Sequence, residues 1–314
     1  MTEDSISISD IAFNSSEARE RIGTEIFETP LIPSLKRGSK LLFKAENFQN
    51  TGSFKIRGAL SKLTALAKAK DLNAFKFITA SSGNHGIACS KAASILGASL
   101  TVVLPETVAK VKLERIKSFG VDVLIQGEES GQAELYAQKM SKEEGYYYIS
   151  PYNDSEVIAG QGTIGLEILE QMKGRSLDNL FISIGGGGLI SGISAVIKHH
   201  SPETKIWGIS AINSCTLADS IKAGRMIETK HFETLADGCA GGVDEDTITF
   251  SITKQTIDEL LWCEENEIEK CFRDMALEEH QIVEGSAALA LAGYEKVCED
   301  ISDQTSVVLL CAAN

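Results

Sequence analysis

The stretch SFKIRGA at residues 53–59 is the most informative part of this chain. It lies between an apolar run that predicts a strand, residues 40–46, and an apolar-periodic run that predicts a helix, residues 58–67. Lys55 at this junction is anchored by rigid elements, and its apolar neighbours disfavour the ammonium form. A neutral amine is what a Schiff base requires. The alternative is a solvated lysine on a helix face.

The stretch SSGNHG at residues 81–86 follows an expected strand, 75–80, and begins an expected helix, 84–97. Its hydroxyls, amide and glycines would direct several donors toward one point at the start of that helix. Such a site suits a carboxylate or a phosphate. An ordinary helix cap followed by a tight turn is the alternative.

A run of four glycines and a leucine, residues 185–189, joins an expected strand, 178–184, to an expected helix, 187–198. Glycines let the backbone wrap an anion at a helix N-terminus. No Lys-Ser or Lys-Thr follows, so this is not a nucleotide-binding P-loop, and the Gly-x-Gly-x-x-Gly spacing of dinucleotide-binding folds is absent. The alternative is a turn that needs glycine for packing.

The C-terminal run VVLLCAAN, residues 307–314, predicts a buried parallel strand that ends near Cys311. Ligands of open α/β sheets bind at the carboxyl ends of the strands, so this thiol would face a site. The alternative is a small core residue.

Composition excludes several classes of protein. The 314 residues are 43% apolar, which is enough for one large core or two lobes. The formal net charge of −14 argues against nucleic acid and anionic membranes as partners. No run reaches transmembrane length, and the N-terminus lacks a secretory signal pattern. Seven cysteines without a Cys-x-x-Cys pair indicate reduced thiols in a cytoplasmic protein, and the five histidines lack zinc-binding spacing.

Strand and helix patterns alternate over most of the length, which predicts parallel sheets. A first set forms a small four-stranded unit, with strands near 75–80, 99–104, 121–126 and 146–149 and helices near 84–97, 108–119 and 130–144. A second set comprises helices near 156–172, 187–198, 214–223, 265–281 and 286–296 and strands near 178–184, 205–210 and 306–311.

In this order and spacing, the four segments closely resemble those of the fold-type II pyridoxal-phosphate enzymes. The nearest groups are the serine/threonine dehydratases and the serine racemases. The resemblance covers residues 29–314 and includes two further runs, ENFQ at 46–49 and VIAGQGT at 157–163. It implies an α/β fold of the tryptophan synthase β type, with two open, twisted, mainly parallel sheets in two lobes.

The resemblance also implies how the chain is divided. A large pyridoxal-phosphate-binding domain, residues 1–67 and 149–314, would carry a small inserted domain, residues 68–148, with the cofactor between them. Relatives are usually homodimers.

The site residues follow from the same resemblance. Lys55 would hold pyridoxal 5'-phosphate as a Schiff base and, once freed, would remove the Cα proton of the substrate. Residues expected around the cofactor are Phe54, Lys55, Asn84, Gly185, Gly186, Gly187, Gly188, Leu189, Gly238, Glu284 and Cys311. Those expected around the substrate carboxylate are Ser81, Ser82, Gly83, Asn84 and His85.

The implied activity is that of an ammonia-lyase, which converts a small β-hydroxy amino acid, L-serine or L-threonine, to a 2-keto acid and ammonia. Cys311 stands where relatives usually place a serine against the pyridine nitrogen. A buried thiol is neutral, so it would leave the ring a weaker electron sink than an aspartate would. That favours rapid β-elimination and disfavours transamination.

Other activities stay open. A serine racemase with side dehydratase activity would need an acid on the face opposite Lys55, and Ser82 matches that position in racemases, although it could instead cap the helix. A dehydratase for 3-hydroxyaspartate or for a hydroxyectoine-pathway substrate is a further option. A non-catalytic relative conflicts with the intact Lys55, and a β-replacement enzyme would carry a different loop at 81–85.

Three stretches depart from the family pattern. The chain ends in CAAN at 311–314 instead of Ser-Gly-Gly-Asn, and VEGSA at 283–287 lacks the usual Glu-Pro. Many relatives bind Mg²⁺ or Ca²⁺ through acidic residues after the strand near 205–210, but here residues 210–216 carry none. Hard cations prefer carboxylates, so we expect no metal site unless Asp219 supplies one.

Overall fold

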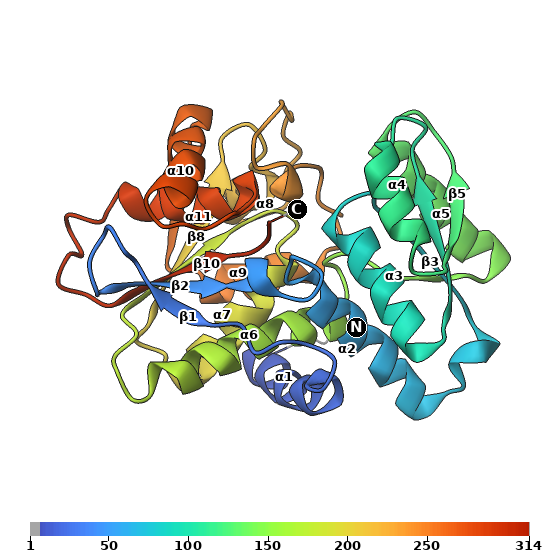
Figure 1. Ribbon diagram of the computed structural model, residues 1–314, viewed down its shortest axis with the longest axis horizontal. Coiled ribbons are helices and arrows are strands. Elements are labelled where there is room, and N and C mark those ends of the chain that lie inside the picture. The colour runs from blue at the N-terminus through green and yellow to red at the C-terminus, as the bar shows by residue number, and fades with distance from the viewer. Residues whose placement is uncertain (1–6, 314) are drawn as a thin grey trace.

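The computed structural model describes residues 7–313, which form two α/β lobes (Figure 1). The large lobe contains a six-stranded sheet in the order β1-β2-β10-β7-β8-β9. Among the strands described for this sheet, only β1 is antiparallel to its neighbour. The strands are β1 (Leu31–Pro33), β2 (Leu41–Ala45), β7 (Asn179–Ser183), β8 (Lys205–Ala211), β9 (Glu259–Cys263) and β10 (Ser306–Leu310).

The small lobe contains a four-stranded sheet, fully parallel, in the order β5-β4-β3-β6. Its strands are β3 (Lys76–Ala80), β4 (Ser99–Leu104), β5 (Asp122–Ile125) and β6 (Tyr147–Tyr148). The chain leaves the large sheet after β2 and returns to it at β7, so the small sheet is an insertion. Two mainly parallel sheets in two lobes are therefore confirmed, and we keep 68–148 as the proposed limits of the small domain.

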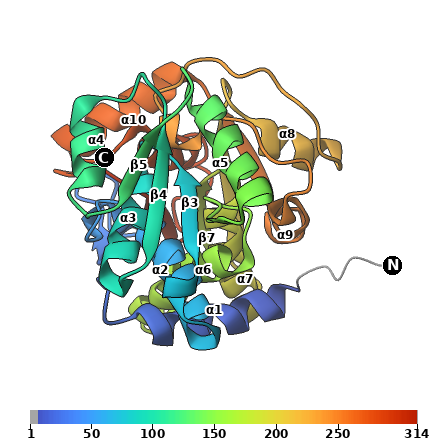
Figure 2. The same cartoon turned by 90° about the vertical axis from the view of Figure 1, so that its right-hand side faces the viewer.

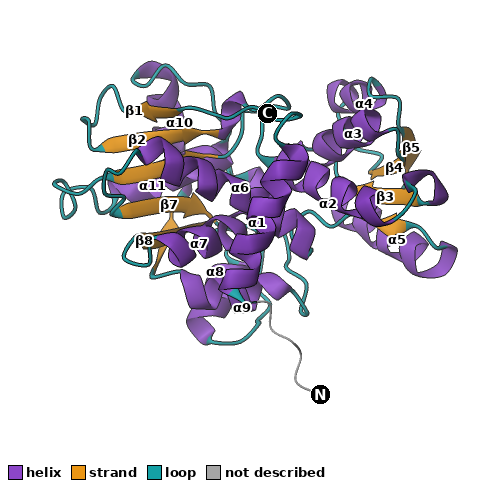
Figure 3. Ribbon diagram, turned by 90° about the horizontal axis from the view of Figure 1, so that it is seen from below, coloured by secondary structure: helices purple, strands orange, loops and turns teal. Residues whose placement is uncertain are grey.

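Helices cover both sheets. They are α1 (Ile8–Ile22), α2 (Lys55–Ala69), α3 (Asn84–Leu96), α4 (Lys110–Lys117), α5 (Ser130–Glu144), α6 (Ser155–Met172), α7 (Gly188–His200), α8 (Thr216–Ala223), α9 (Ile248–Thr256), α10 (Glu265–Leu277) and α11 (Gly285–Glu295). Helix α11 packs on β7, β8 and β10, and α6 packs against α1, α2 and α7 (Figure 3). In the small lobe, α3 and α5 lie on opposite sides of the sheet (Figure 2).

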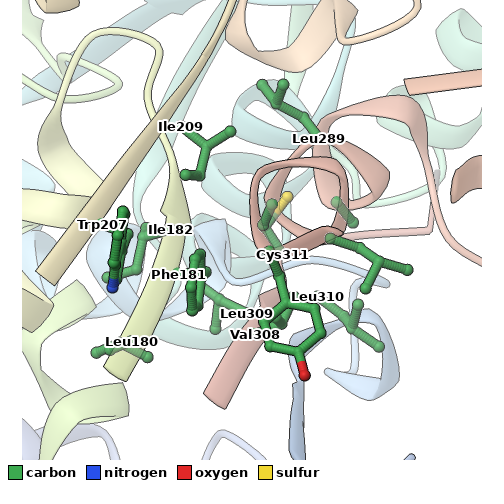
Figure 4. Packing of buried hydrophobic residues seen from close by; sticks show 14 of the residues in the cluster. Leu180, Phe181, Ile182, Trp207, Ile209, Leu289, Val308, Leu309, Leu310 and Cys311 are labelled. Carbon is green, nitrogen blue, oxygen red and sulfur yellow. The ribbon is translucent and has the colours of Figure 1, made fainter. Parts of the chain in front are cut away.

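Each lobe has its own core. In the large lobe, β2, β7 and β10 are buried along their whole length, as parallel strands covered on both faces must be. Phe181 stacks on Trp207 with ring centroids 5.3 Å apart, and Figure 4 shows this pair beside β10, which leads to Cys311. Burying each such side chain contributes about 1.5–3 kcal/mol. A separate cluster around Phe77 and Leu100 fills the small lobe.

Besides three short 3-10 helices, the described residues contain two α-helices and two strands that the sequence patterns did not predict: α1, α9, β1 and β9. For α1 a signal exists, because Ser7 and Asp10 form a capping box at its start. The helix expected at 265–281 ends at Leu277, since the chain reverses at His280, where φ is +55°. None of the described helices is long and apolar enough to cross a membrane.

Candidate active site

Lys55 is the first residue of α2 and lies beside the end of β10. The Phe54 N–H donates to the Cys311 carbonyl at 3.1 Å, and Ser53 pairs with Ala312 in an antiparallel bridge. Backbone hydrogen bonds thus join two segments that lie more than 250 residues apart in the sequence. Lys55, expected to bind the cofactor as a Schiff base, and Cys311, expected at its pyridine nitrogen, come from these segments.

Lys55 is half-buried as a residue, and its Nζ donates to the Pro151 carbonyl at 3.0 Å. Burial lowers its pKa below the usual lysine value, because a charge in an apolar setting loses its hydration. Negative charge on Cys239, Cys89, Cys311 or Glu284 would oppose this effect. The sequence argument for a neutral amine at this position therefore has a physical basis in the fold.

The glycine run at 185–188 is closely packed. A Cβ atom at Gly186 would lie 2.4 Å from the Tyr152 ring, and one at Gly188 would lie 2.8 Å from the Tyr152 Cα. Gly185 would meet the Cys239 backbone at 2.9 Å, and Gly187 has a φ of +87°. Packing thus requires glycine at each position, as the alternative interpretation held.

The same run also fits an anion. Helix α7 begins after Gly187 with no side chain capping its first amides. The Thr249 hydroxyl donates to the Gly186 carbonyl at 2.8 Å and so holds that oxygen on the α9 side. First-turn N–H groups without a cap, at the positive end of a helix, are donors for a phosphate. The residues present therefore fit the phosphate group of pyridoxal phosphate.

The start of α3 differs from a simple cap. Its N-cap is Gly83, which has no capping side chain, and the Ser81 hydroxyl accepts from the Gly83 N–H at 3.2 Å. The Ser82 side chain is half-buried and makes no hydrogen bond to another residue within 7–313. Ser82 therefore does not cap α3, so the capping role that was the alternative for this hydroxyl does not apply.

Asn84 and Glu284 connect the two lobes. The Asn84 amide donates to both carboxylate oxygens of Glu284, at 2.9 and 3.1 Å. Glu284 also donates its backbone N–H to the Ala312 carbonyl at 2.9 Å. Gly238 lies against the same carboxylate, because a Cβ there would be 2.8 Å from Glu284 Oε1. Three of the expected cofactor residues are thus brought together beside the end of β10.

His85 turns its imidazole into the small lobe, where Nε2 lies 3.0 Å from the Ile149 carbonyl. Burial, followed by the charge of Lys55, lowers its pKa to about 3. The ring is neutral and donates from Nε2 to that carbonyl. Of the groups on His85, only the backbone amide stays available for a substrate.

Thiols surround the lysine. Cys311 is buried, and burial raises its pKa well above the usual value, so the thiol is neutral as expected. Burial also raises the pKa of Cys89 and of Cys239 to about 12. The sequence analysis missed these two thiols and Tyr152, because no local pattern indicates which distant residues pack against a lysine or a glycine run.

The stretch after β8 offers hydroxyls and no free carboxylate. The Ser214 hydroxyl pairs with His231 Nδ1 at 3.0 Å and accepts from the Gly241 N–H. Asp219 accepts from the Trp262 indole at 2.9 Å and from the Cys215 thiol. Among the described residues, no group of three acidic, histidine or cysteine side chains is arranged to hold a metal.

Comparison with known proteins decides the family. The family model described as "Pyridoxal-phosphate dependent enzyme" matches residues 22–312. The chain belongs to this family. Its members use pyridoxal phosphate, and the matched region contains Lys55, the glycine run, Glu284 and Cys311.

Individual relatives agree with this assignment. The chain is 36% identical over 295 residues to the catabolic L-threonine dehydratase TdcB of Staphylococcus aureus strain N315, covering 91% of this chain and 82% of that protein. The processed threonine deaminase isoform 2 of Solanum lycopersicum superposes with a TM-score of 0.89 at 29% identity, covering 98% and 90% of the two chains. Maize serine racemase superposes with a TM-score of 0.88 at 28% identity, covering 96% and 93%.

Proposed function

We propose that this protein is a pyridoxal-phosphate-dependent ammonia-lyase that dehydrates a small β-hydroxy amino acid, with L-serine or L-threonine as its default substrate. The observation that carries the proposal is the Lys55 amine, whose pKa burial lowers and whose helix start is bonded to the Cys311 backbone. Similarity to L-threonine dehydratase and threonine deaminase supports the reaction type.

Each group has a separate task in this proposal. The amides of Gly185 to Leu189 bind the cofactor phosphate, and the neutral Cys311 thiol donates to the pyridine nitrogen. Phe54 contacts the cofactor on the side of the lysine, and Asn84, Gly238 and Glu284 contact it on the other side. When bound, pyridoxal phosphate supplies an electron sink for the negative charge that develops on Cα.

The substrate is held at the start of α3. Its carboxylate accepts from Ser81, from Asn84 and from the amides of Gly83 and His85, at the positive end of the helix. The neutral Lys55 amine would accept the Cα proton as a base. The thiol at Cys311 leaves the ring neutral, which favours loss of the β-hydroxyl over longer-lived charge on Cα.

The test is to purify the protein with its cofactor and assay L-serine, L-threonine, 3-hydroxyaspartate and phenylserine for keto-acid release. Lys55→Ala should abolish turnover, whereas Lys68→Ala, an exposed lysine on the same helix, should not change it. Borohydride reduction and mass spectrometry should locate the cofactor on Lys55. Cofactor on another lysine would refute the proposal. Turnover of 3-hydroxyaspartate alone would change the proposed substrate to that acid, and turnover of none of the four compounds would change it to a hydroxyectoine-pathway substrate.

One observation favours serine racemase as a second candidate. The Ser82 hydroxyl does not cap α3, and it follows Ser81 at the loop that faces the substrate. A hydroxyl there can deliver a proton to the face opposite Lys55. Chiral chromatography of reactions with L-serine separates the candidates, because a racemase accumulates D-serine at least as fast as pyruvate.

We further propose that the protein acts in the cytoplasm as a homodimer without a divalent metal. In the stretch after β8 the Ser214 hydroxyl pairs with His231, and both Asp219 oxygens already accept hydrogen bonds. Chelation with EDTA should leave activity and the melting temperature unchanged. A loss that Mg²⁺ restores would place a metal site in this protein.

A further inference from the structure

The first turn of α2 is held from two sides. On one side the Phe54 N–H donates to the Cys311 carbonyl, and the Lys55 N–H donates to the Ser53 hydroxyl at 3.3 Å. Residues two positions apart on a helix point roughly 200° apart, so Arg57 extends away from Lys55. The residues that bind Arg57 therefore hold the first turn of α2 on the face opposite Lys55.

Arg57 is fully buried in a network of four charges. Its Nε and Nη2 donate to the two oxygens of Glu46 at 2.8 and 2.7 Å. Its Nη1 and Nη2 donate to the two oxygens of Glu167 at 2.5 and 2.9 Å. Lys44 Nζ donates to the same Glu167 at 2.5 Å. Two positive and two negative side chains therefore balance, and both carboxylates bind the guanidinium through two oxygens.

The remaining donors are also satisfied. Arg57 Nη1 donates to the Thr163 hydroxyl at 3.1 Å, and Lys44 Nζ donates to the Thr29 carbonyl at 2.7 Å. The Thr29 hydroxyl donates to Glu46 at 2.5 Å. A fully bonded guanidinium has one allowed position, because any shift breaks several bonds without solvent to replace them.

The network joins the elements that carry the site. Glu46 directly follows β2, and Glu167 lies on α6. Strand β2 pairs in parallel with β10, where Ala45 is opposite Leu310, so Glu46 lies beside the strand end that leads to Cys311. Arg57 thus connects the Lys55 turn to the sheet edge that presents Cys311.

Stability alone is a poor explanation of such a network. Removing charges from water is costly, and apolar residues of similar volume often stabilise a core equally well. What bidentate arginine pairs supply is a fixed orientation. A lysine that must reach the substrate Cα needs a fixed position, since a misplacement of about 1 Å can cost about 10²-fold in rate.

We propose that Arg57 is a positioning residue: through Glu46 and Glu167 it fixes the first turn of α2, so that Lys55 Nζ is held within reach of the substrate Cα. This inference rests on the proposed function of Lys55. Arg57 itself touches neither substrate nor cofactor.

The test compares two Arg→Lys substitutions in the holoenzyme. Arg57→Lys keeps the charge but loses the paired hydrogen bonds. The matched control is Arg37→Lys, because Arg37 is also mostly buried and bonded to several carboxylates, Asp274, Glu279 and Glu295, none of which the Arg57 network shares. Both variants should melt at a lower temperature than the wild type.

Only Arg57→Lys should alter the chemistry. We expect kcat to fall about 10²-fold with KM close to the wild-type value, since the loop at 81–86 is untouched. The displacement of Lys55 from the cofactor by L-alanine, followed by stopped-flow absorbance, should slow as well. Alanine has no β-leaving group, so this readout holds even if the proposed dehydration fails.

Glu167→Gln, which keeps the side-chain size and removes one charge, should shift both readouts in the same direction and serves if Arg57→Lys does not fold. The proposal is overturned if the foldable variant melts lower but keeps wild-type kcat and displacement rate, as Arg37→Lys should. A different outcome is that L-alanine displaces Lys55 from the cofactor of the wild-type enzyme but no substrate releases a keto acid. That result would refute the proposed dehydration, and the displacement rates of the variants would still test the positioning role of Arg57.

Discussion

Two helices, α3 in the small lobe and α7 in the large lobe, both begin after a parallel strand with a glycine and without a capping side chain. They differ in how tightly the preceding loop is packed. A Cβ at any residue of 185–188 would lie within 3.0 Å of a neighbour, whereas at Gly83 the nearest atom is the Ser81 hydroxyl oxygen, 3.9 Å away.

This difference matches two kinds of ligand. The run before α7 offers backbone amides alone, on a surface that packing makes rigid, as suits a cofactor that stays bound. The loop before α3 adds hydroxyl and amide side chains and leaves open space at Gly83, as suits a substrate that enters and leaves, although Gly86 in the first turn packs closely on the Ser81 carbonyl. Four experiments test whether the two helix starts differ in this way.

The largest effect is expected for Gly186→Asp. A carboxylate at the α7 start repels the cofactor phosphate, and its Cβ clashes with the Tyr152 ring. Cofactor affinity should collapse while far-UV circular dichroism stays close to the wild type. Gly186→Ala separates the clash from the charge. Unchanged cofactor retention in the Asp variant would mean that the run serves packing only.

The second prediction concerns pH, because His85 belongs to the α3 start and α7 has no such group. Its pKa is about 3 when folded and near 6.5 when unfolded. The unfolded chain therefore binds a proton that the folded chain excludes, and stability is lost as the pH falls from 6.5 toward 3. Relative to His85→Gln, the wild type should lose about 1.4 kcal/mol of unfolding free energy per pH unit between pH 6 and 4.

Urea unfolding of both proteins across that pH range provides the measurement. Parallel stability curves for the wild type and His85→Gln would contradict a buried neutral imidazole at the α3 start.

A smaller effect is expected for Ser82→Ala. Elimination from L-serine should stay within about tenfold of the wild type, since one lost hydrogen bond costs about 1 kcal/mol. If Ser82 is the acid on the opposite face, the variant should also lose D-serine formation and elimination from D-serine. Assays with both enantiomers, with Ser81→Ala as the control, distinguish a carboxylate contact from an acid.

The smallest effect is expected for Gly83→Ala. The α3 start has space for a methyl group, and its φ of −101° is open to other residues. Melting temperature and cofactor content should be close to wild type, with at most a change in KM. Loss of the bound cofactor in this variant would show that the two helix starts are equally constrained, which would remove the distinction drawn here.

Much of this could be predicted from local patterns. Strand and helix alternation predicted all four strands of the small sheet and β2, β7, β8 and β10 of the large one, since these apolar runs are long enough to show a period. The four missed elements are short or weakly patterned: β1 has three residues, and α9 carries threonines on its buried side. The family motifs marked Lys55, the glycine run, Glu284 and Cys311, because each lies at a strand or helix end.

Residue spacing and local residue type were enough to establish the fold class and the family, and they indicated the residues that we propose carry the chemistry. The surroundings of these residues became visible only in the folded chain. It packed Tyr152 onto the glycines, turned His85 away from the substrate loop, left Ser82 without a capping role and enclosed Arg57 between Glu46 and Glu167. Such contacts join residues far apart in the chain, and burial, which sets the pKa of Lys55 and Cys311, exists only once the sheets have formed.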